Sequence, residues 1–340
     1  MPLQIDLAFK WGSGKKKEEP PKPSAPKEEE SSNATCTTTC SCTSSASSSA
    51  SSSSSSDLSV HSTQHSHSVQ ATQTGGLSTA IGRPLSNRRL VVFVRHAERV
   101  DRVFPAWLTL AHSNGAYRPY DTNLPRRLPN RRGGLGAFAN DPPLTRLGQT
   151  LAVLCGKSMA MVQFRPTCLE TAHLISVAMS SPAKIRVEPG LFDFAGWYLD
   201  GVPVWLTENE MVGASLAIDR RYKPIESAQA VMGRRGETEH DFYRRIHAVV
   251  SKINKTAAGE SVLIVGHAST MDAGVRSLLG LSRAAPKFLE LDRMGDRYPY
   301  CSSFVLEQTK ASTQFTAGKT LQTITTGGQS SALDKKYLLR

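Results

Sequence analysis

The chain has 340 residues and a formal net charge of +12. It contains no run of about 18 apolar residues, which predicts no membrane-spanning helix, and its first residues lack the charge order of a secretion signal. Its six cysteines are too sparse and irregular for the disulfide framework of a small secreted domain. We therefore expect a cytoplasmic protein, with the nucleus as the open alternative.

The N-terminal quarter differs in composition from the remainder. Residues 1–88 are rich in Ser, Thr, Lys, Glu, Pro and Gln, and Ser44–Ser56 is an uninterrupted Ser/Ala run. Such a segment has too little apolar surface to offset the entropy of ordering, about 1–2 kcal/mol per residue. The sequence predicts a disordered region at 1–88, one domain at 89–312 and a partly ordered C-terminal extension at 313–340.

Two tracts in the N-terminal region contain metal-ligating residue types. Neither has the paired spacing of a structural zinc site, and both lie in Ser/Thr-rich sequence. They are Cys36, Cys40 and Cys42, followed by His61, His65 and His67. We expect neither a metal nor a cofactor.

The first half of the domain begins with a buried strand. Leu90–Val94 is a short apolar run rich in β-branched residues, typical of a strand covered on both faces. Residues 101–142 show little periodicity and predict a long surface excursion. Apolar residues then recur at helical spacing between 144 and 161, at Leu144, Leu147, Leu151 and Leu154. A second helix is predicted at 168–179.

The second half continues the alternation of strands and helices. Lys184–Glu188 predicts a strand, and Thr238 with Asp241 resembles a capping box. The helix that follows would bury Phe242, Ile246, Val249 and Ile253. Strands are predicted at Ser261–Val265 and Ser302–Leu306. This alternation predicts an α/β fold with a mostly parallel, doubly wound sheet flanked by helices.

Basic and imidazole side chains follow two of these strands. Arg95, His96 and Arg99 come directly after Leu90–Val94, and His267 follows the strand at 261–265. Ligands of a doubly wound sheet bind beyond the carboxyl ends of its strands, where helix N-termini also favour anions. Imidazole is a competent nucleophile and guanidinium groups match phosphate oxygens, so the pattern favours phosphoryl transfer through a phosphohistidine.

The same residues have a less specific interpretation. A lone histidine after a strand is usually a hydrogen-bonded loop residue, and spacing alone leaves the question open. Between Arg88 and Arg132 there are ten arginines and three acids, which is consistent with a solvated basic surface or with nucleic-acid binding. Without interleaved aromatics or zinc-finger spacing, a compact anionic ligand is favoured over nucleic acid.

Several blocks in one order carry a resemblance to a known family. The run VVFVRHAERVD at 91–101 resembles the signature of the histidine phosphatase superfamily, and more narrowly the phosphatase domain of the Sts (TULA) proteins. The likeness covers about residues 90–307, whereas the N-terminal third resembles no ubiquitin-associated or SH3 module. Further matching blocks lie at 122–125, 128–129, 132–134, 141–145, 171–173, 186–192 and 263–269.

The resemblance implies a role for each residue of the site. His96 would be the phosphorylated nucleophile, and Arg95, Arg99 and His267 would hold the phosphoryl oxygens. The general acid would be Asp193, where close relatives carry Glu, and Glu188 is a fallback that is better explained as a structural residue.

The chain departs from the family at a further phosphate-binding arginine. Thr167 stands at the matching position, and the segment 161–166 is shortened, so Arg165 would have to reach the site from a different backbone position. Losing one preorganised donor typically costs about 10²–10³ in rate.

These observations leave three functions open. The first is a metal-independent phosphatase acting on a phosphoprotein, including phosphotyrosine, or on a small phosphate ester. The second is a weak or inactive pseudophosphatase that binds a phosphorylated ligand or a protein. The third, a phosphoglycerate-type mutase, rests on superfamily analogy alone. The resemblance also suggests a homodimer, and we expect neither a nucleic-acid nor a membrane partner.

Overall fold

The computed structural model describes residues 88–112, 115–159, 169–181, 183–198, 203–309 and 311–340. The Ser-rich region, its cysteine and histidine tracts, Arg165 and Thr167 all lie outside these residues. The expectations that concern them therefore stay predictions.

A four-stranded sheet forms the centre of the domain. It contains β1 (Arg88–Arg95), β2 (Val262–Gly266), β3 (Ser303–Thr309) and β4 (Thr316–Ala317), in the order β2-β1-β3-β4. A separate hairpin pairs β5 (Thr325–Thr326) with β6 (Gln329–Ser330). The α/β class is confirmed, but the expected parallel sheet needs a correction within the described residues. Only β1 and β2 are parallel, while β3 runs antiparallel to β1 and β4 antiparallel to β3.

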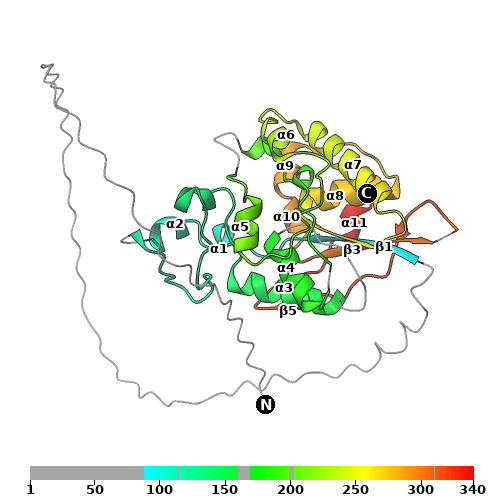
Figure 1. Cartoon of the computed structure of the whole chain (residues 1–340). Coiled ribbons are helices and arrows are strands. Elements are labelled where there is room, and N and C mark those ends of the chain that lie inside the picture. The colour runs from blue at the N-terminus through cyan, green and yellow to red at the C-terminus, as the bar shows by residue number, and fades with distance from the viewer. Residues whose placement is uncertain (1–87, 113–114, 160–168, 182, 199–202, 310) are drawn as a thin grey trace, which may run out of the picture. The chain divides into compact units, whose positions relative to one another are not determined.

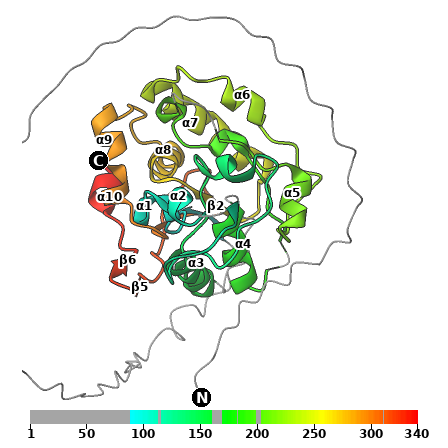
Figure 2. The same cartoon turned by 90° about the vertical axis from the view of Figure 1, so that its left-hand side faces the viewer.

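Helices cover both faces of this sheet (Figures 1 and 2). On one face lie α3 (Arg146–Met159) and α4 (Leu169–Ala178), and on the other α7 (Glu239–Thr256) and α8 (Ala268–Leu279). Because side chains alternate along a strand, β1 sends Val92 and Val94 into the α3/α4 core and Val91 and Phe93 into the α7/α8 core. Both sets are buried, which explains the continuous apolar run.

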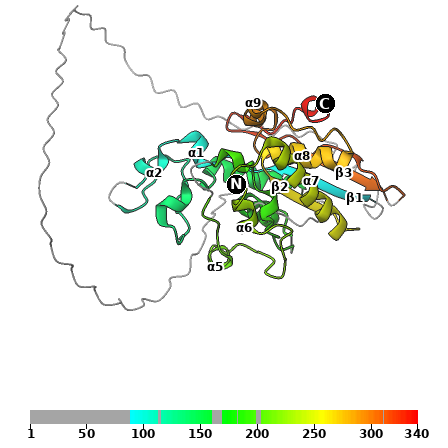
Figure 3. The ribbon, with the colours of Figure 1, turned by 90° about the horizontal axis from the view of Figure 1, so that it is seen from above.

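The excursion between β1 and α3 lies beyond the carboxyl end of β1 (Figures 1 and 3). It contains α1 (Val100–Val103), α2 (Trp107–Leu110) and the 3-10 helix η3 (Gly134–Phe138). Although its sequence lacks periodicity, it has a small core of its own. The buried members are Val100, Trp107, Ala111, Leu124 and Phe138.

Shorter elements complete the domain. They are the 3-10 helices η4 (Pro189–Leu191) and η5 (Ala195–Trp197), and the helices α5 (Glu208–Gly213), α6 (Ala228–Met232), α9 (Phe288–Asp292), α10 (Met294–Arg297) and α11 (Lys335–Leu338). Leu338 of α11 is completely buried in the α7/α8 core. In the part of the chain that the structure describes, no helix combines the length and apolarity needed to cross a bilayer.

Most of the predicted elements are confirmed. β1, α4, β2 and β3 fall where the sequence placed them, and both hydrogen bonds of the Thr238–Asp241 capping box are present at the start of α7. The strand predicted at Lys184–Glu188 was wrong: Ile185 forms a single bridge with Ile218. The Glu188 carboxylate instead accepts backbone N–H groups, including that of Gly190, and turns the chain into η4.

A glycine lets α3 approach the segment that follows β1 closely. A Cβ atom on Gly148 would lie 2.3 Å from the carbonyl oxygen of Glu98. The Glu98 side chain is buried there and accepts from the Thr145 hydroxyl at 2.6 Å. The packing of α3 therefore fixes the backbone just after His96.

Candidate active site

The two histidines singled out in the sequence meet at the carboxyl ends of β1 and β2. Arg95 pairs with Gly266 in the parallel register, and the His96 N–H donates to the Gly266 carbonyl at 2.8 Å. His267 is the next residue and occupies the N-cap position of α8. The imidazole centroids lie 4.9 Å apart, with the rings inclined at 68°. Two residues 171 positions apart in the sequence are thus brought to one place.

His96 is held as a neutral imidazole with one nitrogen free. Its Nδ1 lies 2.8 Å from the Ala97 carbonyl oxygen, which can only accept, so Nδ1 carries the proton and Nε2 carries the lone pair. Burial lowers the pKa of His96 well below 6.5, and the charges of His267, Arg95 and Arg99 lower it further. The Nε2 lone pair is therefore available at neutral pH.

Arg95 is fixed by backbone carbonyls. Its Nη1 donates to Gly295 O at 2.8 Å and to Tyr298 O, and its guanidinium stacks on the Tyr300 ring at 4.3 Å. Its Nε is buried and has no hydrogen-bond partner among the described residues. A buried, unpaired N–H on the residue before His96 is a donor that an anionic ligand could satisfy.

Arg99 lies on the excursion side of the site. Its Nε and Nη2 donate to the two carboxylate oxygens of Asp101, at 3.0 and 2.7 Å. Burial opposes the charge of Arg99, but the hydrogen bonds and charge of Asp101 outweigh it and raise the pKa of Arg99. The guanidinium is thus permanently cationic and oriented before any ligand binds.

Asp193 is bound to the second histidine. Its Oδ2 lies 3.0 Å from His267 Nδ1, and its Oδ1 accepts from Ser269 Oγ at 2.6 Å and from the Phe194 N–H at 3.0 Å. Burial alone would raise the pKa of Asp193, but the His267 charge and these hydrogen bonds lower it below the usual value of 3.8. The surroundings therefore favour the ionised carboxylate, whereas a general acid must carry a proton.

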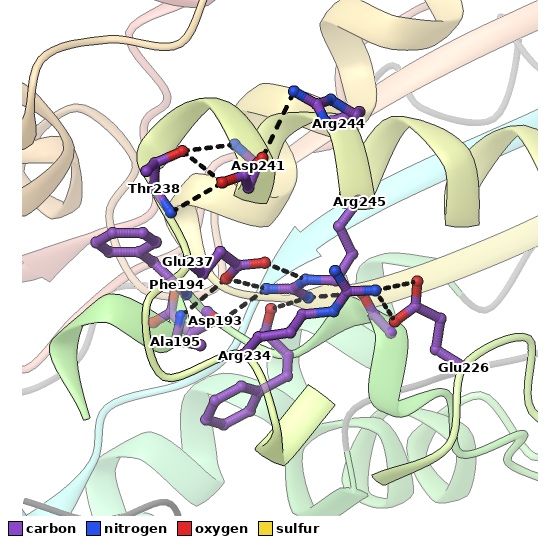
Figure 4. Close-up of polar contacts among 12 residues, drawn as sticks. Asp193, Phe194, Ala195, Glu226, Arg234, Glu237, Thr238, Asp241, Arg244 and Arg245 are labelled. Atoms are coloured by element: carbon purple, nitrogen blue, oxygen red, sulfur yellow. Dashed lines mark hydrogen bonds and ion pairs between the residues drawn. The ribbon is translucent and has the colours of Figure 1, made fainter. Parts of the chain in front are cut away.

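A buried ion pair supports the loop that carries Asp193 (Figure 4). Arg245 of α7 donates to the carbonyls of Gly190, Phe192 and Asp193 at 2.8–3.1 Å. Two further donors of Arg245 bind the Glu237 carboxylate at 2.7 and 2.8 Å. Both side chains are 1% exposed, so the loop position depends on a pair that water does not screen.

Aromatic rings line the His267 side of the site. The Phe192 ring lies 5.0 Å from Tyr198, 5.3 Å from Trp205 and 6.5 Å from His267. Burial and the Asp193 charge raise the pKa of Tyr198, so it stays protonated at neutral pH. Sequence reasoning missed Tyr198, Trp205 and Ser269. Only Ser269 had a signal, since it lies in the helical turn just after His267.

Glu188 and the arginines of the excursion make contacts that do not involve His96 or His267. Glu188 accepts four hydrogen bonds, from three backbone N–H groups and the Tyr222 hydroxyl. On the excursion, Arg126, Arg127 and Arg132 face solvent, whereas the Arg131 side chain is only 3% exposed and pairs with Asp141 at 3.0 Å. Across the described ranges, no three His, Cys, Asp or Glu side chains are grouped to hold a metal ion.

Comparisons with known proteins identify similar chains. Residues 129–312 match the model of the histidine phosphatase superfamily, branch 1. The ecdysteroid-phosphate phosphatase of Drosophila melanogaster is 33% identical over 264 residues, which is 74% of this chain and 33% of that protein. The ubiquitin-associated and SH3 domain-containing protein A of Homo sapiens is 34% identical over 223 residues, 61% of this chain and 33% of that protein. The chain thus spans about a third of the length of these relatives.

One solved structure is similar to this chain in fold. The crystal structure of the ecdysone phosphate phosphatase from Bombyx mori in complex with tungstate aligns with a TM-score of 0.59 at 29% identity. The alignment covers 74% of this chain and 99% of that one.

Proposed function

The chain belongs to the histidine phosphatase superfamily, and we propose that it is a metal-independent phosphatase acting through a phosphohistidine at His96. The observation that carries the proposal is the approach of His96 and His267 at 4.9 Å between ring centroids. The neutral Nε2 of His96 supplies a nucleophile at this position. The relatives described above include phosphatases, which supports the reaction class.

Two displacements at phosphorus make up the proposed reaction. Nε2 of His96 attacks the phosphorus of a phosphate monoester, a P–N bond forms, and the ester P–O bond breaks as the leaving oxygen takes up a proton from solvent water. A water molecule then attacks the phosphohistidine, the P–N bond breaks, and inorganic phosphate leaves. No electrons are transferred, and the lone pair of His96 is restored at the end.

Cationic groups around His96 suit the charge of a phosphoryl group. Arg95 presents its unpaired Nε–H, Arg99 carries a permanent charge, and the Nε2 side of His267 is not used by Asp193. Preorganised donors of this kind stabilise developing negative charge at little reorganisation cost. Arg165 is a further proposed phosphate ligand from the sequence and lies outside the described residues.

The geometry supports a changed role for Asp193. Proton donation to the leaving oxygen, which the resemblance implies, requires a protonated carboxyl. The hydrogen bonds from His267, Ser269 and Phe194 favour the carboxylate instead. We therefore propose that Asp193 acts mainly by orienting His267. The Nδ1–H of His267 donates to the carboxylate, and its Nε2–H faces the phosphoryl oxygens.

The aromatic rings favour an ester with a flat, apolar leaving group. Phe192, Tyr198 and Trp205 form a wall beside His267 against which an aryl or steroid group can pack. Phosphotyrosine and an ecdysteroid phosphate, the latter named for two relatives, both meet this requirement. A panel of phosphotyrosine peptides, a steroid phosphate and phosphoserine would rank these classes by kcat/KM.

The reaction itself can be tested with one active-site variant and a matched control. Wild type is expected to hydrolyse an aryl phosphate in the presence of a metal chelator, and His96→Ala to abolish this hydrolysis. His240→Ala, at the solvent-facing start of α7, should leave it unchanged. Acid-labile phosphate trapped on wild type but not on His96→Ala would identify the intermediate. If wild type is as inert as His96→Ala yet binds phosphate, the pseudophosphatase alternative is correct.

A further inference from the structure

The orientation of Arg95 depends on a short segment that precedes β3. Both carbonyls that accept from Arg95 Nη1, those of Gly295 and Tyr298, belong to α10 or its C-terminal cap. The Tyr300 ring, on which the guanidinium stacks, follows two residues later. Any displacement of α10 would therefore move the guanidinium of Arg95.

A buried carboxylate anchors this segment. The Tyr298 side chain is completely buried, and its hydroxyl donates to Asp272 Oδ1 at 2.5 Å. Asp272 lies on α8 and is itself 0% exposed. Its other oxygen accepts from the Tyr243 hydroxyl at 2.6 Å. Asp272 therefore connects α8, α7 and the segment that holds Arg95.

The charge of Asp272 is compensated by Arg340. Arg340 Nη1 donates to Asp272 Oδ1 at 2.9 Å, and its guanidinium stacks on the Tyr337 ring at 3.8 Å. It is the only ion-pair partner of Asp272 among the described residues. The Arg340 side chain is 31% exposed. A cation that reaches in from the surface thus compensates a carboxylate that has no contact with water.

Several contacts hold Arg340 and its neighbours against the domain (Figure 2). Arg276 Nη1 donates to the carbonyls of Leu338 and Arg340, at 3.3 and 2.7 Å. The Asp334 N–H donates to the Arg297 carbonyl at 3.1 Å, which joins this segment directly to α10. Residues 334–340 lie beyond residue 312, where the family match ends.

We propose that Arg340 is a positioning residue that sets the orientation of Arg95. Its charge compensates Asp272, and the Asp272–Tyr298 hydrogen bond then fixes the carbonyls that hold the Arg95 guanidinium. Without this charge, Asp272 would be a buried and uncompensated carboxylate, an arrangement that proteins relieve by admitting water or shifting neighbours. The inference rests on the proposed function in taking Arg95 as a phosphate ligand.

The first test measures the affinity for inorganic phosphate by calorimetry. Arg340→Met is expected to weaken phosphate binding by about tenfold or more, since small displacements of positioned groups have large effects. Arg340→Lys should retain most of the affinity because it keeps the charge. Lys336→Met, which removes an exposed charge from the same segment, should bind phosphate like wild type.

A double-mutant cycle separates positioning from a general loss of structure. If Arg340 acts through Arg95, Arg340→Met has no further effect on phosphate affinity in an Arg95→Ala background. An equal loss in both backgrounds would overturn the proposal. If Arg340→Met does not fold, Arg340→Met with Asp272→Asn removes both charges, and it is expected to fold with Arg95 still in place.

A second measurement does not depend on phosphate binding. Arg95 is one of the charges that lower the pKa of His96, so an NMR titration of His96 reports on the guanidinium position. The pKa of His96 should rise in Arg340→Met as it does in Arg95→Ala, and an unchanged titration would overturn the inference. Shifted titration in a protein that neither binds nor hydrolyses phosphate would leave Arg340 as a positioning residue and reject the proposed function.

Discussion

The carboxylate of Asp193 lies 3.0 Å from Nδ1 of His267, whose imidazole centroid lies 4.9 Å from that of His96. Because a carboxylate can only accept, this contact keeps a proton on Nδ1 of His267 and orients the ring. Ser269, from the first turn of α8, holds the other oxygen of Asp193. Asp193, which was expected to donate a proton, is therefore hydrogen-bonded to His267, which was expected to bind phosphate.

Asp193→Asn is expected to slow the hydrolysis of phosphate esters with good leaving groups and with poor leaving groups by similar factors. An amide keeps the shape but removes the negative charge that faces Nδ1 of His267, and the loss should be about 10²–10³ in kcat. The measurement is kcat for a series of aryl and alkyl phosphates that differ in leaving-group pKa. If Asp193 were a general acid, the pattern would differ, because removing a general acid slows the hydrolysis of esters with poor leaving groups far more than that of p-nitrophenyl phosphate. If kcat of Asp193→Asn falls steeply as the pKa of the leaving group rises, Asp193 is a general acid after all.

The pH dependence of activity should reflect the lowered pKa of His96. Burial, first of all, keeps its imidazole neutral below pH 6.5, so the acid limb of kcat/KM is expected below that value. The unfolded chain binds a proton at His96 more readily than the folded chain. Stability should therefore fall as pH decreases from 6.5 toward the folded pKa. NMR titration of His96 and denaturation between pH 4 and 8 would check both effects, and an acid limb above pH 6.5 would contradict them.

Arg245→Met should strongly destabilise the fold. It leaves Glu237 as an unpaired buried carboxylate and frees three loop carbonyls, for an expected loss of about 3–5 kcal/mol. Arg244→Met is the matched control: its side chain is 69% exposed on the same helix turn, and a change within about 0.5 kcal/mol is expected. Urea denaturation of both variants gives the comparison. Equal stabilities would mean that the Glu237 pair does not support the loop.

Gly148→Ala should damage the site through the backbone. The added methyl would meet the Glu98 carbonyl at 2.3 Å, so α3 must move away from the segment that follows β1. We expect a loss of about 1–3 kcal/mol in stability, together with a lower kcat. Gly136→Ala is the control, since nothing lies within 4 Å of its Cβ position. Thermal unfolding and aryl phosphate hydrolysis would be measured on both; unchanged values in Gly148→Ala would show that α3 can move away freely.

The sequence predicted the elements whose signals are local. The apolar run of β1 and the capping box of α7 depend on neighbouring residues, and the structure contains both. The prediction of a strand at Lys184–Glu188 was wrong because the structure of this segment depends on partners distant in sequence. The Glu188 carboxylate binds N–H groups at Ile225 and Glu226, which no local pattern shows. The antiparallel direction of β3 was missed for the same reason.

The positions of His96 and His267 directly after two predicted strands were enough to predict that they meet, but not which residues hold each of them. The partners of Asp193 are its neighbour Phe194 and, from α8, Ser269 and His267, while the carbonyls that hold Arg95 come from α10 and its cap. Nothing in the spacing of the sequence relates Asp193 to α8 or Arg95 to α10. The sequence therefore predicted which side chains meet in the candidate site, while their protonation states depend on contacts that only the folded chain creates.

The register of β1 against β2 leaves little freedom to move His96, the proposed nucleophile, along the chain. One backbone hydrogen bond, from His96 N–H to Gly266 O, sets the separation of the two imidazoles. A histidine at position 95 or 97 would start from a different backbone position and would lose the approach to His267 that this hydrogen bond supports. Attempts to engineer a different reaction into this scaffold should therefore exchange the side chain at position 96 and keep the backbone as it is.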